Sequence, residues 1–203
     1  MKKALFILTM MMLFLISCGS KSTDGEGAGA AAAENTVKDE SLKVGVVYST
    51  GGLGDNSYND ATKRGLEKAK TELGITYDEY EPKDPNTEAE NKLREFAEAG
   101  DYTLIVATGF TMKDALMNVA KEFPEQKFVI IDETIEGMPN VASLTFKEHE
   151  GSFLAGALAA MMTKSNVVGY VGGAEAPVIQ KFEIGFEQGA KYVKPDIKFL
   201  PVY

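Results

Sequence analysis

From Leu42 onward, the chain alternates short apolar runs with segments that are apolar on one side only. The runs predict strands over residues 42–49, 75–81, 103–107, 128–132 and 141–146. Apolar positions three or four residues apart predict helices over 58–73, 87–98 and 111–123. Strands and helices that alternate in this way predict an α/β fold whose parallel, doubly wound sheet is covered on both faces.

A second series of elements begins at Ser152, with helices predicted over 152–162 and about 178–193 and strands over 167–172 and 199–202. The small-residue helix is too short to span a membrane, which takes about 20 apolar residues, so we expect a core helix. The chain thus divides into an N-terminal α/β lobe, 42–146, and a partial second α/β lobe, 147–203. Because this second sheet is incomplete, we expect either a fragment or a partner that completes the lobe.

The N-terminus has the three parts of an export signal. Lys2 and Lys3 precede an apolar stretch, Ala4–Ile16. The last two residues of this stretch begin the sequence LISC, which ends at Cys18. This resembles a bacterial lipobox and predicts a signal peptide over residues 1–17 and a lipid anchor on Cys18. Residues 18–41, rich in Gly, Ala, Ser and Glu, predict a flexible tether. We therefore expect a protein anchored to the cell membrane on its extracytoplasmic face; an ordinary secretory signal with a chance cysteine is the alternative.

Charge excludes one large class of partners. The chain carries 21 basic and 30 acidic residues, a formal net charge of −9. Nucleic-acid binding needs clustered Lys and Arg, so we expect no nucleic-acid partner. Cys18 is the single cysteine, which leaves no disulfide to stabilise the fold.

Polar residues follow three of the predicted strands. Asp55, Ser57, Tyr58 and Asn59 lie in the Gly-rich segment after the first strand, and Asp132 ends the fourth. In a sheet ordered 2-1-3-4-5 these segments converge with 108–111 beyond the carboxyl ends of the strands, where ligands bind. The glycines match neither a P-loop nor a GxGxxG motif. They alternatively form only a turn, with Ser57 or Asn59 as a helix cap.

Catalytic signatures are missing from the sequence. His149 is the one histidine, and its acidic neighbours suggest a surface position. There is no Ser–His–Asp set, no His/Cys cluster for zinc and no EF-hand loop. We therefore expect no enzyme activity, no cofactor and no metal.

Three blocks resemble one family: GGLGDNSYNDATKRGLEKA, then VATGF with DALMNVAKEFPEQKFVIID, then NVASLTFKEHEGSFLAGALAAMMTK with VGYVGG and GFEQGAK. Their order and spacing are similar to the BMP/PnrA family of basic-membrane-protein lipoproteins. The resemblance implies a type I periplasmic-binding-protein fold, with two α/β lobes around a cleft. It also implies a monomeric substrate-binding lipoprotein that takes purine nucleosides and delivers them to the permease of an ABC transporter.

The same resemblance implies roles for individual residues. In that family the aromatic residue after the Gly-rich segment stacks on the nucleobase; it is usually Phe and is Tyr58 here. Asp55, Ser57 and Asn59 would contact the base or line its pocket, and Asp132 would accept hydrogen bonds from the ribose hydroxyls. Two further residues would form the cleft wall: Gly109 and Phe110.

Other functions stay open. The same fold class binds sugars and other small polar molecules, and abundant surface lipoproteins also act as adhesins or antigens. A truncated product without a function of its own is the third alternative. Because the second lobe is partial, we expect residues 42–203 to bind nucleosides weakly or not at all.

Overall fold

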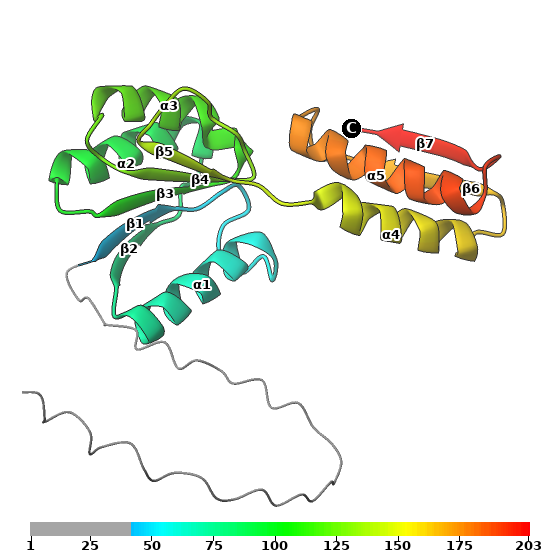
Figure 1. Cartoon of the computed structure of the whole chain (residues 1–203), viewed down its shortest axis with the longest axis horizontal. Coiled ribbons are helices and arrows are strands. Elements are labelled where there is room, and N and C mark those ends of the chain that lie inside the picture. The colour runs from blue at the N-terminus through cyan, green and yellow to red at the C-terminus, as the bar shows by residue number, and fades with distance from the viewer. Residues whose placement is uncertain (1–41) are drawn as a thin grey trace, which may run out of the picture. The chain divides into compact units, whose positions relative to one another are not determined.

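A five-stranded parallel sheet organises the first part of the protein (Figure 1). The computed structural model describes residues 42–203, so the predicted signal peptide, the Cys18 anchor and the tether lie outside the described residues. The strands follow the order β2-β1-β3-β4-β5 and are β1 (Lys43–Val47), β2 (Thr76–Tyr80), β3 (Leu104–Thr108), β4 (Phe128–Ile131) and β5 (Val141–Leu144). The sequence prediction of a doubly wound parallel α/β sheet is confirmed.

Helices cover both faces of this sheet. They are α1 (Tyr58–Leu73), α2 (Pro85–Ala99), the short 3₁₀ helix η1 (Phe110–Met112) and α3 (Lys113–Glu122). On one face Val46 packs with Leu66 of α1. On the other, Val47 packs with Leu93 of α2 and Leu116 of α3. Because neighbouring side chains of a strand point to opposite faces, β1 contributes to both cores.

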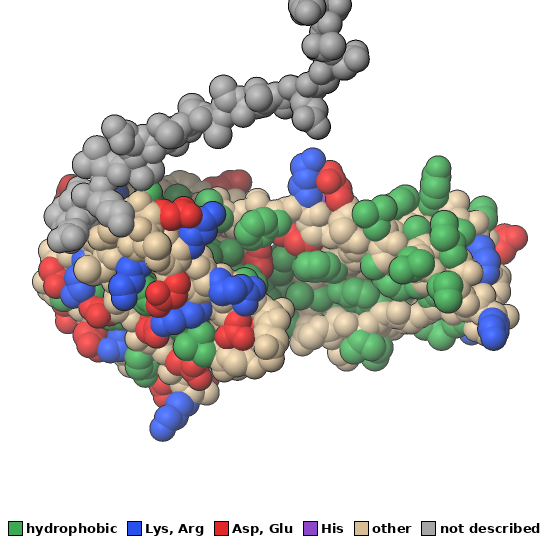
Figure 2. Space-filling model, turned by 90° about the horizontal axis from the view of Figure 1, so that it is seen from below, with side chains coloured by type: hydrophobic (Ala, Val, Ile, Leu, Met, Phe, Trp, Pro, Cys, Tyr) green, Lys and Arg blue, Asp and Glu red, His purple; other side chains and the backbone are tan. Residues whose placement is uncertain are grey.

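The second part consists of α4 (Glu148–Met162), β6 (Val167–Val171), α5 (Pro177–Val193) and β7 (Lys198–Val202). β6 and β7 pair in parallel, and one face of the pair packs on the helices through Val168 and Ala190. The described residues, 42–203, all belong to one compact unit. Figure 2 shows apolar side chains gathered along this second part. Among the exposed apolar residues are Leu154 and Leu158 of α4.

Element boundaries differ from the sequence prediction mainly at α4. The predicted start was Ser152, but the helix begins at Glu148. Its first turn holds Glu148 and Glu150, which interact favourably with the positive end of the helix dipole but carry no apolar periodicity. The predicted helix at 111–123 similarly begins as η1 at Phe110. No helix within residues 42–203 is long and apolar enough to cross a membrane.

Candidate functional site

Asp55 organises the loop that leads from β1 into α1. Its carboxylate accepts hydrogen bonds from the backbone N–H groups of Ser57 and Asn59, each over 2.8 Å, and from that of Asp60 over 3.2 Å. These bonds hold the pKa of Asp55 below its ordinary value, the bond from Asn59 most of all. The carboxylate satisfies N–H groups that a helix start leaves unpaired, so its acceptor capacity is largely used within the protein.

Asn59 is the fully buried member of the loop, only 1% exposed. Its Oδ1 accepts a hydrogen bond from the N–H of Ser49 over 2.9 Å, and its Nδ2 donates to Asp55 over 3.2 Å. Ser57, in contrast, is exposed at the N-terminal end of α1 and makes no side-chain cap bond. The structure therefore places Asn59 behind the loop and Ser57 on its surface.

Tyr58 and Asp132 face each other from different elements. Tyr58 begins α1, and its hydroxyl is buried without a hydrogen-bond partner. Asp132 directly follows β4 and has φ of 64°, a left-handed conformation that Asp and Asn tolerate better than most residues. Burial raises the pKa of Tyr58, and the charge of Asp132 raises it further. The pKa of Asp132 is raised by burial first and by the charge of Glu148 second.

These two residues line a pocket of about 730 Å³, which we call the Tyr58 pocket. Its floor and sides are mostly apolar, with aromatic surface from Phe146 and Phe182 and a carboxylate from Glu148. The remaining lining residues are Ala61, Thr62, Ile131, Lys147, Gly151, Ser152 and Ala155. The pocket therefore combines flat hydrophobic surface with a few acceptor groups, a typical composition for small-molecule sites.

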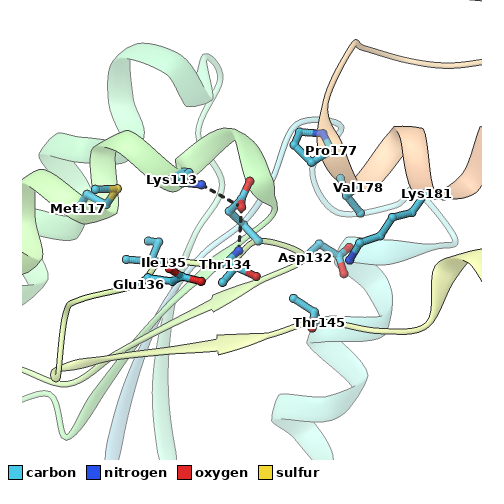
Figure 3. Close-up of a pocket in the computed structure, with 11 residues that line it drawn as sticks. Lys113, Met117, Asp132, Thr134, Ile135, Glu136, Thr145, Pro177, Val178 and Lys181 are labelled. Carbon is cyan, nitrogen blue, oxygen red and sulfur yellow. Dashed lines mark hydrogen bonds and ion pairs between the residues drawn. The ribbon is translucent and has the colours of Figure 1, made fainter.

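A second pocket of about 430 Å³ shares Asp132 with the first (Figure 3). Lys113 on its rim forms an ion pair with Glu133 over 3.1 Å. Figure 3 shows the Lys181 side chain extending from α5 toward the Asp132 carboxylate. That ammonium group lowers the pKa of Asp132, but less than burial raises it.

Two residues expected in the cleft wall line neither of the two pockets: Gly109 and Phe110. Gly109 has φ of 104° and donates its N–H to Ile131 over 3.1 Å. A Cβ at this position would overlap the Ser49 side chain, so the glycine allows β3 and the loop after β1 to approach closely. Phe110 is half-buried at the start of η1.

Sequence reasoning missed Glu148 and Lys181. Glu148 belongs to the acidic segment around His149, which suggested a solvated surface, yet its side chain is 5% exposed. The signal was its position in the chain: it lies four residues after the end of β5, and β5 is the neighbour of the strand that Asp132 follows. His149 itself is exposed, as predicted. Within residues 42–203, no group of His, Cys, Asp or Glu side chains is arranged to hold a metal ion.

Residues 42–202 match the family described as "ABC transporter substrate-binding protein PnrA-like". The chain belongs to this family. It is a family of substrate-binding proteins rather than of enzymes. The resemblance stated from the sequence blocks is thereby confirmed.

Relatives support the same assignment along almost the whole chain. The "CD4+ T-cell-stimulating antigen" of Listeria innocua is 37% identical over 97% of this chain, and 56% of that protein is covered. The "ABC transporter nucleoside-binding protein BmpA" of Lactococcus lactis subsp. cremoris is 34% identical over 98% of this chain, again covering 56% of the relative. The chain therefore spans about half the length of these relatives.

A solved structure agrees with the fold. An ABC transporter solute-binding protein from Aeropyrum pernix matches with a TM-score of 0.72 and 32% identity, covering 80% of this chain and 47% of that protein. The fold is thus that of the periplasmic solute-binding proteins, of which this chain holds part.

Proposed function

We propose that this protein binds purine nucleosides in the Tyr58 pocket and delivers them to an ABC importer. In this proposal Cys18 carries the lipid anchor, which keeps the binding protein on the extracytoplasmic face of the membrane, close to the permease. The acidic, mostly apolar pocket suits an uncharged ligand with a flat ring and hydrogen-bond donors. It is poorly suited to a phosphate group, because Asp132 and Glu148 would repel it.

One observation carries the proposal: the ring of Tyr58 and the carboxylate of Asp132 meet at one pocket. A base that stacks on an aromatic ring gains about 1–3 kcal/mol. A carboxylate is a strong acceptor for a vicinal pair of hydroxyls, since hydrogen bonds to charged groups exceed neutral ones. Asp55 and Asn59 support the ligand indirectly, by fixing the loop that holds Tyr58.

The Lactococcus relative supports the choice of ligand, because its name states that it binds nucleosides. The Tyr58 pocket offers the two features that such a ligand needs, an aromatic face and acceptors. A sugar can also pack its C–H groups on an aromatic ring, but it leaves less flat apolar surface to fill this mostly apolar pocket than a purine base does. A nucleoside accounts for both.

Saturation-transfer NMR on the purified chain tests the proposal, because it detects even millimolar dissociation constants. We expect transfer to the base and ribose protons of adenosine, guanosine or inosine, and none to free ribose. Tyr58→Ala should strongly reduce the transfer, while Tyr192→Ala, a change of an exposed ring outside the pocket, should preserve it. Equal transfer with Tyr58→Ala would contradict the proposal. Because the second lobe is partial, we expect weak binding; absence of transfer to every nucleoside at millimolar concentration would contradict the proposal for this chain.

A surface antigen is the second candidate, because the Listeria relative is named as a T-cell-stimulating antigen. This role predicts binding to host or matrix protein that nucleosides do not displace. The test measures binding of the chain to host or matrix protein with and without millimolar adenosine. Protein binding that adenosine does not displace would favour the antigen role.

A further inference from the structure

Glu148 is a buried carboxylate with one oxygen that has no hydrogen bond and only a long ion-pair contact. Its Oε1 accepts a hydrogen bond from the N–H of Phe146 over 3.2 Å, as suits the first turn of α4. Its Oε2 is buried and has no hydrogen-bond partner, and the nearest cation, the ammonium group of Lys181, lies 3.7 Å away. Buried polar groups are nearly always hydrogen-bonded, so an unused carboxylate oxygen requires an explanation.

The location of Glu148 explains why this oxygen has no hydrogen bond. Glu148 lines the Tyr58 pocket together with Asp132 and Tyr58. The Tyr58 hydroxyl is likewise buried without a partner. Glu148 and Asp132 are close enough for the charge of Glu148 to raise the pKa of Asp132. Two buried polar atoms without a hydrogen bond, Oε2 of Glu148 and the hydroxyl of Tyr58, thus belong to one cavity with two carboxylates of like charge.

We propose that Glu148 is a second ligand-binding carboxylate of the Tyr58 pocket and a determinant of its specificity. Its Oε2 accepts a hydrogen bond from a hydroxyl or amino group of an uncharged nucleoside. Together with Asp132 it disfavours the same nucleoside carrying a phosphate. The ammonium group of Lys181 offsets part of the negative charge of the two carboxylates. This inference rests on the proposed nucleoside-binding function.

A purely structural role of Glu148 explains only one of its two carboxylate oxygens. The bond from Phe146 uses Oε1, and the 3.7 Å contact with Lys181 is longer than a hydrogen bond. Neither explains why Oε2 is buried at a pocket without a donor. A structural role also predicts that loss of the charge destabilises α4, whereas a binding role predicts that it relieves repulsion from Asp132.

The test compares Glu148→Gln with Glu150→Gln in the full chain. Glu150 lies in the same helical turn, but its side chain is exposed and paired with Lys147 over 2.8 Å. Dissociation constants for adenosine and adenosine 5′-monophosphate are measured by NMR titration, and melting temperatures without ligand by calorimetry. We expect Glu148→Gln to weaken adenosine binding by about tenfold or more. In the same variant, the ratio of the dissociation constant of the monophosphate to that of adenosine should decrease, and the melting temperature should not fall. Glu150→Gln should change none of these.

Lys181→Gln provides a second variant with the opposite charge change. The Lys181 side chain is 46% exposed, so its replacement should leave the fold intact. We expect the preference for adenosine over the monophosphate to widen, because more negative charge faces the phosphate. This variant keeps the proposal testable if Glu148→Gln fails to fold.

Three results would overturn the inference. Two concern Glu148→Gln: an unchanged affinity for adenosine and unchanged preference over the monophosphate, or a lowered melting temperature with that preference unchanged. The third is an unchanged preference for adenosine over the monophosphate in Lys181→Gln. Each of these is read against a parent chain that binds adenosine. If the parent binds no nucleoside at all, the proposed function fails and the inference falls with it. The two failures are therefore distinguished by the parent titration.

Discussion

The side chain of Asn59 accepts a hydrogen bond from the backbone N–H of Ser49 across the loop that follows β1, over 2.9 Å. A helix residue thereby fixes the backbone just after β1, ten positions earlier in the chain. The same amide donates to Asp55, which caps the start of α1. The position of the Tyr58 ring thus depends on polar bonds inside the loop.

Asn59→Ala should destabilise the protein by about 1–3 kcal/mol, because it leaves the part-buried N–H of Ser49 without its acceptor and removes a fully buried side chain. Urea unfolding followed by circular dichroism measures this change. Ser57→Ala is the matched control: the Ser57 side chain is exposed and caps nothing, so stability should stay the same. Equal stability of the two variants would show that the Asn59 bonds contribute little.

Asp132→Asn should stabilise the unliganded protein near neutral pH. Burial and Glu148 raise the pKa of Asp132, so the folded state binds its proton more tightly than the unfolded chain does. The protonated form therefore favours folding below the ordinary carboxyl pKa, and this contribution is lost as the pH rises through the raised value. The gain from Asn should accordingly vanish below about pH 4.

Asn suits this test because it tolerates the left-handed backbone of residue 132, whereas Ala would add strain of its own. Melting temperatures of both proteins between acid and neutral pH provide the measurement. A stabilisation that is the same at every pH would contradict the assigned cause, since it would not involve titration of the Asp132 carboxyl.

Much of the first sheet could be predicted from the sequence. The periodicity of Tyr58–Leu73 gave the bounds of α1, and the apolar runs gave all five strands to within about two residues. These elements are predictable because burial of apolar side chains dominates their packing. The order β2-β1-β3-β4-β5 likewise agrees with the expected arrangement.

The polar interior of the site was less accessible to sequence reasoning. Asp55 and Asn59 were both expected to meet a ligand, but their polar atoms mostly satisfy the protein's own backbone. Glu148 appeared as one acidic residue among several, and only the folded chain shows that it is buried. Residue type and spacing do not reveal which partner a polar group finds, because that partner can come from a distant element.

Tyr58→Phe should retain nucleoside binding, while Tyr58→Ala should weaken it by roughly 1–3 kcal/mol through loss of stacking. The hydroxyl of Tyr58 is buried without a partner, so its removal should also raise the stability of the unliganded protein. NMR titration with adenosine and thermal unfolding measure the two effects. Loss of binding in Tyr58→Phe would show that the hydroxyl, rather than the ring, makes the essential contact.

The contact between α4 and α5 yields the last prediction. Gly189 of α5 lies so close to α4 that a Cβ would overlap the carbonyl oxygen of Phe153, and Gly185 approaches His149 in the same way. Gly189→Ala should force the helices apart and destabilise the protein by about 1–3 kcal/mol. Gly65→Ala, in the open interior of α1, should instead stabilise it by about 0.5–1 kcal/mol, because glycine is a poor helix former. Chemical unfolding of both variants measures the difference. If Gly189→Ala is as stable as Gly65→Ala, the two helices do not depend on close backbone contact.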